Sequence, residues 1–183
     1  MNYCNQCGAK LDWLIPEGDQ RHRYVCTHCS TIHYENPKII AGALVEHGNN
    51  ILLCRRAIHP GYGLWTLPAG FMENGESLAE AAARETREEA CAHITIGKLF
   101  SAVSLPYHNQ VHLFHLATLS TPGIAPGVES LETVWFAEAD IPWADIAFRT
   151  VRWTLQRYFE DRANGQFACH HFTFEHPAQP NEK

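Results

Sequence analysis

The stretch that most constrains this chain runs from residue 70 to residue 92 and reads GFMENGESLAEAAARETREEACA. Ser77 is a suitable helix cap, and Glu80 three residues later completes the pattern of a capping box. The Ala-rich run that follows has high helix propensity and no internal Gly or Pro. We therefore predict a helix from about Ser77 to about Ala90.

One face of the predicted helix begins apolar and ends in carboxylates. At about 100° per residue, that face holds Leu78, Ala81, Ala82, Glu85, Glu88 and Glu89. Glu85 and Glu89 are four residues apart, where like charges repel, and a hard cation such as Mg²⁺ converts that repulsion into ligation. The alternative is a solvated charged face, which the ladder of alternating sign at Glu80, Arg84 and Glu88 favours.

The spacing of charged residues and glycine over residues 70–92 decides between a metal site and a solvated charged face. Gly70, Glu76, the pair Arg84-Glu85 and the pair Glu88-Glu89 resemble the Nudix box, the signature of the Nudix hydrolases. Two departures from that signature occur: Cys91 stands at its glycine, and Thr86 and Ala92 stand at its apolar positions. These departures concern the helix end and its packing and leave the carboxylates intact.

The resemblance implies a metal-dependent hydrolysis of a diphosphate that is linked to a nucleoside. It implies that Glu85 and Glu89 ligate Mg²⁺ or Mn²⁺, that Glu88 is a ligand or the base, and that the backbone at Gly70, with Ala69 beside it, completes the metal shell. Such cations neutralise the diphosphate and lower the pKa of a bound water. Which glutamate acts as the general base stays open.

Two Cys-x2-Cys pairs lie near the N-terminus, separated by eighteen residues: Cys4, Cys7, Cys26 and Cys29. This spacing is typical of a structural zinc site, because four thiolates close a tetrahedral shell. Two redox or disulfide pairs are the alternative. We predict a zinc ribbon over residues 1–35, a β module that needs metal because it lacks a core.

The charge of the chain bears on its partners. The formal net charge is −6, and residues 1–35 carry three Lys or Arg against four Asp or Glu. Since a phosphate-binding surface needs a basic excess, we expect no nucleic-acid partner. Apolar runs fall short of a membrane span, no signal segment is visible, and the cysteine count of seven is odd. We therefore expect a cytoplasmic protein with no membrane partner; a homodimer stays open.

Four candidate site residues lie outside the box. Arg55 and Arg56 end a predicted hairpin (38–46 and 51–55), and one of them could reach a substrate phosphate. Tyr107 lies in the 105–110 loop, between predicted strands 94–103 and 111–119, and is our candidate for substrate selection; a plain hairpin loop is the alternative. Glu132 precedes a predicted strand at 134–137, where the resemblance implies a further acidic group near the metals; Glu129 lies close by, and either could be only a loop charge.

The fold that follows is α/β: a Nudix α/β/α sandwich with a mixed sheet, with the zinc ribbon before it. We expect the Nudix domain over residues 36–176, with a second amphipathic helix at 150–164, and a disordered tail over 177–183.

The stretches CTHC, ENPK, LLCRR, GLWTLPAGF and APGVESLE resemble the shorter ribbon-bearing Nudix group that includes plant plastid FAD and ADP-ribose pyrophosphohydrolases. That resemblance implies cleavage of a small-molecule dinucleotide, FAD or ADP-ribose, with release of AMP. NADH pyrophosphatases are the first alternative; the chain keeps only Ser104 and Pro106 of their downstream motif. The others are a non-catalytic nucleotide sensor and a zinc-ribbon adaptor for protein or nucleic acid.

Overall fold

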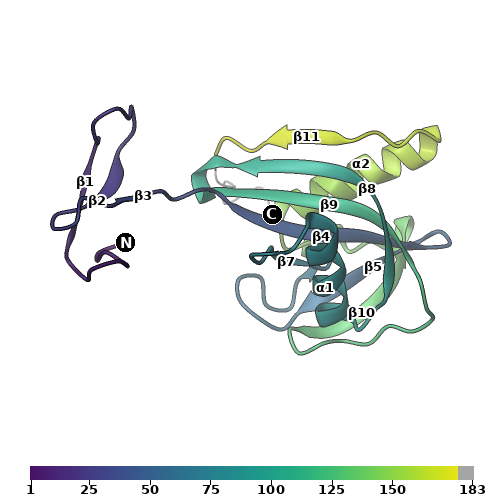
Figure 1. Cartoon of the computed structure of the whole chain (residues 1–183). Coiled ribbons are helices and arrows are strands. Elements are labelled where there is room, and N and C mark those ends of the chain that lie inside the picture. Colours follow the sequence, from purple (N-terminus) through teal and green to yellow (C-terminus); the bar gives the residue numbers. More distant parts are fainter. Residues whose placement is uncertain (177–183) are drawn as a thin grey trace. The chain divides into compact units, whose positions relative to one another are not determined.

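The structure is a computed structural model that describes residues 1–176; the tail over 177–183, which we predict to be disordered, lies outside the described residues. Contacts within the chain divide it into two units, Met1–Asn36 and the part from Pro37 onward. Figure 1 labels the elements, which in chain order are β1 (Leu11–Leu14), β2 (Arg23–Cys26), β3 (Ile32–His33), β4 (Lys38–His47), β5 (Asn50–Arg56), β6 (Trp65–Thr66), β7 (Ala69–Phe71), α1 (Leu78–Ala90), β8 (Ile94–Leu105), η1 (Pro106–His108), β9 (Gln110–Leu119), β10 (Ser130–Ala137), η2 (Glu138–Asp140), η3 (Trp143–Asp145), α2 (Arg149–Asn164) and β11 (His170–Thr173).

The N-terminal unit is a three-stranded antiparallel sheet in the order β1-β2-β3. Cys4 and Cys26 are buried in it, whereas Trp13, Leu14 and Ile15 are exposed. A unit of this size that exposes its large apolar side chains gains little from burial and depends on another source of stability.

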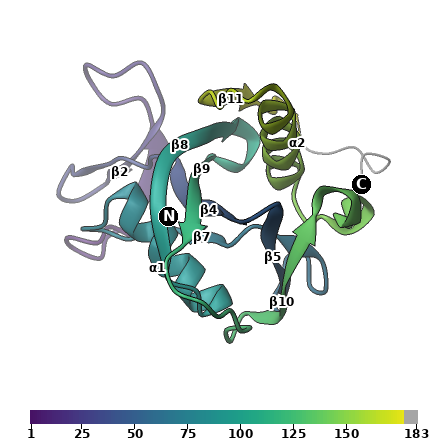
Figure 2. The same ribbon diagram turned by 90° about the vertical axis from the view of Figure 1, so that its right-hand side faces the viewer.

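The second unit is built on one mixed sheet in the order β10-β5-β4-β9-β8-β11, with β6 beside β5 and β7 beside β4. The pairs β4–β9 and β8–β11 are parallel and the others are antiparallel. Figure 2 shows α1 and α2 on opposite sides of this sheet. The predicted α/β/α sandwich with a mixed sheet is therefore confirmed.

Because both faces of the sheet are covered, its central strands are apolar on both sides. Ala43, Leu44 and Val45 in β4 are successive and fully buried. Leu44 packs with Val151 and Leu155 of α2, whereas its two neighbours in sequence belong to the cluster that contains Ala82 and Ala90 of α1. Within the described residues, no helix is long and apolar enough to cross a membrane.

Three features of the strands differ from the sequence prediction. The predicted hairpin of β4 and β5 pairs only at its tip, where Glu46 lies opposite Ile51; most of β4 pairs with β9 and β7 instead. The segment Ala69–Phe71, for which we predicted no strand, forms β7. The edge strand β11 was not predicted, because its sequence HHFT lacks an alternating apolar pattern.

Helix α1 begins and ends with recognisable caps. The hydroxyl of Ser77 accepts from the backbone N–H of Glu80, whose carboxylate accepts from the N–H of Ser77, so the predicted capping box is present. At the other end, Cys91 adopts the left-handed conformation with φ of 50°. That conformation is usually occupied by glycine, because a Cβ atom makes it unfavourable.

We expect Cys91→Gly to raise the free energy of unfolding by about 1 kcal/mol, because glycine adopts this C-cap conformation without strain. Urea unfolding of both proteins under reducing conditions measures the effect. Cys91→Ala is the control, since it removes the thiol and keeps the Cβ atom. An equal gain from alanine would mean that the thiol, and not the backbone conformation, lowers stability.

Candidate active site and metal sites

Arg84 links the middle of α1 to the loop before the helix. Its guanidinium donates to both carboxylate oxygens of Glu76, at 2.6 and 3.1 Å, and to the carbonyl oxygen of Phe71 at 3.0 Å. It also donates to Glu85 Oε1 at 2.7 Å and to Glu88 Oε2 at 3.0 Å. A bidentate pair of this kind fixes geometry, so Arg84 holds β7, the loop and the glutamates of α1 in one arrangement.

Glu85 and Glu89 lie on the buried side of α1, at the strand β7. The backbone N–H of Ala69 donates to Glu89 Oε2 at 3.1 Å. A Cβ atom on Gly70 would lie 2.4 Å from Glu85 Oε1, so the carboxylate occupies the space that a side chain at residue 70 would need. The structure thus brings Gly70, Glu85 and Glu89 together, while Glu88 lies at the solvent edge, its side chain 54% exposed.

The environment of these carboxylates opposes their ionisation. Burial raises the pKa of Glu89 to about 8, with a contribution from the charge of Glu85, although the hydrogen bond from Ala69 acts in the opposite direction. Burial also raises the pKa of Glu85, against the effect of Arg84 and together with the charges of Glu88 and Glu129. Such a site has an excess of negative charge that a bound cation would neutralise.

The two acidic candidates before β10 lie in different places. Glu132 is in β10 opposite Arg55, and their side chains form an exposed ion pair at 3.0 Å. Glu129 precedes the strand and is exposed, and its charge makes a small contribution to the raised pKa of both Glu85 and Glu89. The sequence prediction gave precedence to Glu132 because the resemblance implies an acidic group three residues before Trp135, and it kept Glu129 as the neighbouring candidate. The bulge between Ser130 and Glu132, which is not visible in sequence, gives the two glutamates different surroundings.

The two arginines of β5 have different surroundings. Arg55 donates to the carbonyl oxygen of Gly63 at 2.9 Å and pairs with Glu132. Arg56 is buried, donates to the carbonyl oxygen of Pro60 at 2.7 Å and lies over the ring of Phe148. Its charge also opposes, to a small extent, the rise in the pKa of Glu89 that burial causes.

Tyr107 lies in η1, where its ring contacts that of His108. Near this turn, the backbone N–H of Lys38 donates to the carbonyl oxygen of Asn109 at 2.9 Å. Tyr107 is half-buried and is held by this hairpin rather than by the carboxylates.

A groove of about 540 Å³ borders the loop before α1 and is lined by Pro37, Lys38, Ile39 and residues 71–76. Phe71 is 51% exposed, and Lys38 Nζ lies 5.2 Å from the centre of its ring. The sequence prediction missed both residues. Strand alternation was the available signal, since it directs Phe71 away from the face of Gly70, but residues 69–71 were not expected to form a strand.

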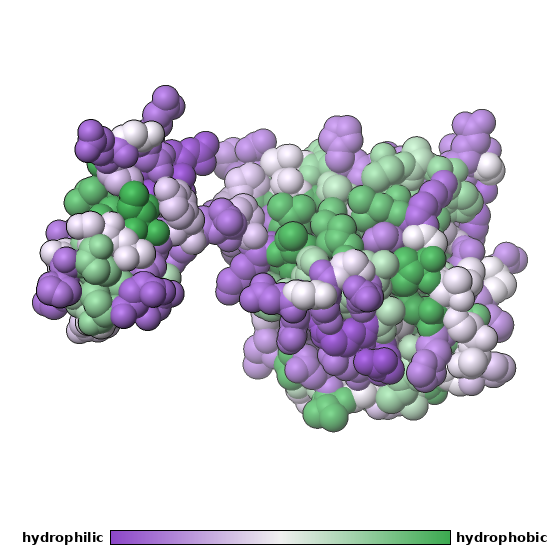
Figure 3. Space-filling model, viewed as in Figure 1, coloured by the Kyte–Doolittle hydropathy of each residue, from purple (hydrophilic) through white to green (hydrophobic). Residues whose placement is uncertain are grey.

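Figure 3 shows hydrophilic residues gathered over α1 in the second unit. The carboxylates there are not packed as tightly as metal ligands. Within residues 1–176, the four cysteine sulfurs are the only set of three or more His, Cys, Asp or Glu ligand atoms that lie within 4.8 Å of one another. Arg84 pairs with Glu85 and Glu88, so these two would have to turn away from Arg84 to share a cation.

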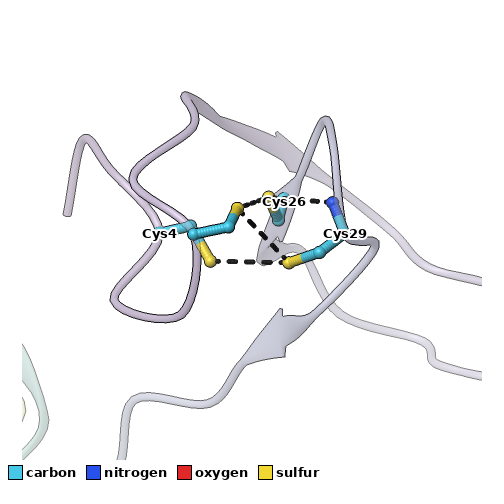
Figure 4. A group of neighbouring side chains, drawn as sticks. Cys4, Cys26 and Cys29 are labelled. Carbon is cyan, nitrogen blue, oxygen red and sulfur yellow. Dashed lines mark hydrogen bonds between the residues drawn. The ribbon is translucent and has the colours of Figure 1, made fainter.

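The cysteines of the N-terminal unit converge on one point. Figure 4 shows the sulfur atoms of Cys4, Cys26 and Cys29 directed toward one another. The Sγ atom of Cys7 lies 3.4 Å from that of Cys26 and 3.5 Å from that of Cys29, and Cys4 lies 3.7 Å from Cys29. Zinc ligated at about 2.3 Å separates tetrahedral sulfurs by about 3.8 Å, whereas a disulfide requires about 2.05 Å. The geometry therefore fits a Zn²⁺ ion and no disulfide.

Groups around the cysteines support this fit. Hydrogen bonds from Thr31 lower the pKa of Cys29 to about 6, which favours the thiolate that zinc binds. The buried ring of His33 lies with Nε2 3.4 Å from the sulfur of Cys4. A donor to a ligating sulfur orients the ligand, a role that sequence reasoning did not assign to His33.

We expect purified protein to contain about one zinc ion per chain, because four converging thiolates form a closed structural site. Elemental analysis of protein kept reduced measures it. Cys26→Ser should lose the metal, whereas Cys169→Ser, which alters an exposed cysteine outside the cluster, should retain it. Protein without zinc, or with disulfides among the four cysteines, would contradict the prediction.

Comparisons with known proteins give the following matches. A family model described as the NUDIX domain matches residues 36–155, and one described as Nudix N-terminal matches residues 2–35. Two curated relatives are named NAD-capped RNA hydrolase NudC. The protein from Vibrio parahaemolyticus is 29% identical over 145 residues, 78% of this chain and 53% of that protein. The protein from Vibrio cholerae is 29% identical over 170 residues, which are 89% of this chain and 61% of that protein. The chain thus spans little more than half the length of these relatives.

Two solved structures are similar. A NUDIX hydrolase from Nitrosomonas europaea has a TM-score of 0.93 and 50% identity and covers 96% of this chain and 100% of its own. An ADP-ribose pyrophosphatase from Streptococcus suis has a TM-score of 0.58 and 19% identity, and the match covers 76% of this chain and 100% of that protein. At this identity, the likeness shows the fold alone.

Proposed function

The chain belongs to the Nudix hydrolase family, and we propose that it cleaves the diphosphate bridge of FAD or ADP-ribose and releases AMP. The observation that carries this proposal is the pair of buried carboxylates, Glu85 and Glu89, with raised pKa values beside the backbone of Gly70. A dinucleotide fits the site because its diphosphate carries the charge that a cation on these carboxylates would neutralise. The domain arrangement we propose is a zinc ribbon over 1–35 and the catalytic domain over 36–176.

The donor set suits a hard divalent cation, Mg²⁺ or Mn²⁺, because all of its ligand atoms are oxygens. The residues that would hold the cation are Glu85, Glu88, Glu89, Glu129 and the backbone of Gly70, with Ala69 beside it. When bound, the cation supplies charge neutralisation of the diphosphate and activation of a water molecule. In the hydrolysis, the oxygen of water bonds to one phosphorus and the bridging P–O bond of the phosphoric anhydride breaks. One glutamate accepts the proton of the water, and Glu88 is one of the candidates for this role.

The protein groups around the cation position the substrate. Arg84 holds the loop after β7 and the glutamates of α1 in fixed positions relative to one another. Arg56 contributes a buried positive charge that acts on Glu89, and we propose that this charge also attracts the diphosphate. Because Arg56 is already held by Pro60 and Phe148, it needs no reordering when substrate binds. Arg55 is the weaker candidate for a phosphate contact, since Glu132 neutralises it.

The groove beside the loop offers a surface for the flat ring system of the substrate. The exposed ring of Phe71 can stack on adenine or on the isoalloxazine of FAD, and Lys38 lies next to that ring. Tyr107 stays our candidate for substrate selection, because its turn is bonded to Lys38 through Asn109. Both assignments concern substrate choice rather than bond cleavage.

Outside the helix, we assign the additional acidic role to Glu129 and keep Glu132 as the alternative. We expect Glu129→Gln to lower kcat by about tenfold or more, because it removes a charge from the cluster. Glu132→Gln should stay within about threefold of the native rate, since its carboxylate pairs with Arg55 at the surface. Initial rates at saturating Mg²⁺ decide between the two, and the reverse order of effects would restore Glu132 as the catalytic residue.

The substrate is tested by chromatography of products from FAD, ADP-ribose, NADH and nucleoside triphosphates, run side by side with Mg²⁺. We expect FAD to yield FMN and AMP, and ADP-ribose to yield ribose 5-phosphate and AMP. A strong preference for NADH or for a triphosphate would contradict the substrate assignment and leave the Nudix mechanism intact. No turnover of any substrate would favour a nucleotide sensor.

A second candidate is hydrolysis of NADH or of an NAD cap on RNA, which the names of the relatives from Vibrio favour. This qualifies our expectation that the protein has no nucleic-acid partner. Adding an NAD-capped oligoribonucleotide to the substrate panel tests it. Faster cleavage of that oligonucleotide than of FAD and ADP-ribose would make this candidate the preferred function.

A further inference from the structure

The cysteine cluster of the N-terminal unit has a buried side and an exposed side. Cys4 and Cys26 are buried, whereas Cys7 and Cys29 are exposed. The two exposed cysteines come from different Cys-x2-Cys pairs, and their Sγ atoms lie 3.5 Å apart. A solute in the surrounding water can therefore reach one sulfur of each pair, and these two sulfurs are neighbours.

The two buried sulfurs are held in place by groups of the surrounding chain. The sulfur of Cys26 accepts from the backbone N–H groups of His28 and Cys29, at 3.4 and 3.3 Å, and Figure 4 shows the second of these contacts. The sulfur of Cys4 lies 3.4 Å from Nε2 of the buried ring of His33. Burial and these contacts protect Cys4 and Cys26, which leaves the exposed pair to react with a solute.

The exposed pair has the chemistry that oxidation requires. A cysteine that ligates zinc does so as the thiolate, and the thiolate is the form that reacts with an oxidant. Susceptibility to oxidation follows thiolate character and exposure, and Cys7 and Cys29 would combine the two. A disulfide bond requires a separation of about 2.05 Å, so the two sulfurs have to approach by about 1.5 Å.

Loss of two thiolates would affect the N-terminal unit as a whole. Trp13, Leu14 and Ile15 are exposed, so this unit has little apolar burial to hold it together without a metal. A shell that loses two of four ligands no longer retains zinc, and a fold that depends on zinc is lost with it. The unit from Pro37 onward has its own core and does not depend on this metal.

We propose that Cys7 and Cys29 form a modification site for hydroperoxides, at which oxidation joins them in a disulfide and releases the zinc ion. One thiolate attacks an oxygen of hydrogen peroxide, the O–O bond breaks, and a sulfenic acid and a hydroxide ion form. The other thiolate attacks the sulfenic sulfur and displaces a second hydroxide ion. The two sulfurs lose two electrons, and with two protons from the solvent the peroxide becomes two water molecules. The inference rests on the predicted zinc site and not on the proposed substrate.

The test treats the intact chain, reduced and loaded with zinc, with hydrogen peroxide. A chromophoric chelator measures the released zinc, and mass spectrometry of peptides maps the disulfide. We expect about one zinc ion and one disulfide between Cys7 and Cys29 per chain, both reversed by a dithiol reductant and added Zn²⁺. A variant with Cys91→Ser and Cys169→Ser, which removes the exposed cysteines outside the cluster, should respond as the native protein does.

A matched pair of variants tests the choice of cysteines. Histidine replaces one cysteine in many structural zinc sites, so Cys7→His and Cys4→His can both keep the metal. Cys7→His removes one member of the exposed pair and should release zinc at least about tenfold more slowly than the native protein. Cys4→His alters a buried ligand and should release zinc at the native rate. Where a histidine variant binds no zinc, the disulfide map of the native protein decides alone.

The outcomes separate the inference from the zinc site itself. Zinc that stays bound while Cys91 and Cys169 become oxidised would overturn the inference, and so would a disulfide within either Cys-x2-Cys pair. Equal rates of zinc release from Cys7→His and Cys4→His would also contradict it. Reduced protein that contains no zinc before treatment would instead refute the metal site, and the inference with it.

Discussion

Replacing Glu85 or Glu89 with glutamine is expected to lower kcat by at least about 100-fold while the fold is retained. Glutamine has nearly the same shape and cannot carry the negative charge that a divalent cation requires, so the loss falls on the chemical step. Neither substitution removes packing, because the amide fills the same space beside Gly70 and Ala69. Initial rates of AMP release at saturating Mg²⁺ and substrate, with circular dichroism to verify the fold, measure the effect.

Glu160→Gln is the control for this experiment. Its carboxylate lies on α2, is 51% exposed and pairs with Arg157, so the substitution removes one negative charge away from the cluster. We expect it to turn over at the native rate. Near-native turnover in both Glu85→Gln and Glu89→Gln would show that the metal is bound elsewhere in the protein.

The same substitution at Glu89 is expected to stabilise the protein when no Mg²⁺ or Mn²⁺ is added, by a few kcal/mol at pH 8. Burial raises the pKa of Glu89 in the folded protein from the ordinary value of 4.5 to about 8. Between these two values the folded chain binds more protons than the unfolded chain, so the free energy of unfolding decreases as pH rises. Stability is therefore highest below about pH 4.5 with respect to this group and reaches its lower plateau above about pH 8.

Urea unfolding at pH 5.5 and pH 8, without added divalent cations, measures this prediction. The native protein should lose stability between the two pH values, and Glu89→Gln should lose much less, because glutamine has no proton to release. Glu160→Gln serves again as the control and should follow the native protein. A native protein that is equally stable at both pH values would mean that Glu89 is ionised without cost and that its burial has little electrostatic effect.

Together the two predictions describe a trade-off at one residue. The carboxylate that would bind the cation is unfavourable in the metal-free fold, because it is buried beside Glu85 with the N–H of Ala69 as its hydrogen-bond donor. A bound cation would neutralise the excess negative charge of the two buried carboxylates, and their burial would then strengthen the attraction between carboxylate and cation. Binding of Mg²⁺ or Mn²⁺ should consequently raise the stability of the native protein more than that of Glu89→Gln.

Local chemistry made several features readable from the sequence. The capping box of Ser77 and Glu80 predicted where α1 begins, because each partner lies within the same turn. The two Cys-x2-Cys pairs predicted the cysteine cluster, because each pair brings its two sulfurs together locally and four thiolates complete one tetrahedral zinc site. Alternating and helical apolar periods predicted the second helix and the long strands, and thus the sandwich.

Features that depend on the pairing of distant segments required the tertiary structure. The sequence contains no signal for a parallel partner, so the pairing of β4 with β9 and the edge strand β11 were not predicted. Likewise, Phe71 becomes an exposed ring beside Lys38 only because residues 69–71 pair with β4.

The distinction between Glu129 and Glu132 shows the physical reason most clearly. Both are glutamates in one short stretch, and their spacing in sequence does not separate them. A bulge after Ser130 pairs Glu132 with Arg55, while Glu129 precedes the strand, where its backbone carbonyl oxygen accepts from the N–H of Ala57. The sequence determined which residue types could bind a cation, because that is a property of each side chain. Only the tertiary structure decided which of them meet, because backbone contacts between segments far apart in the chain set those distances.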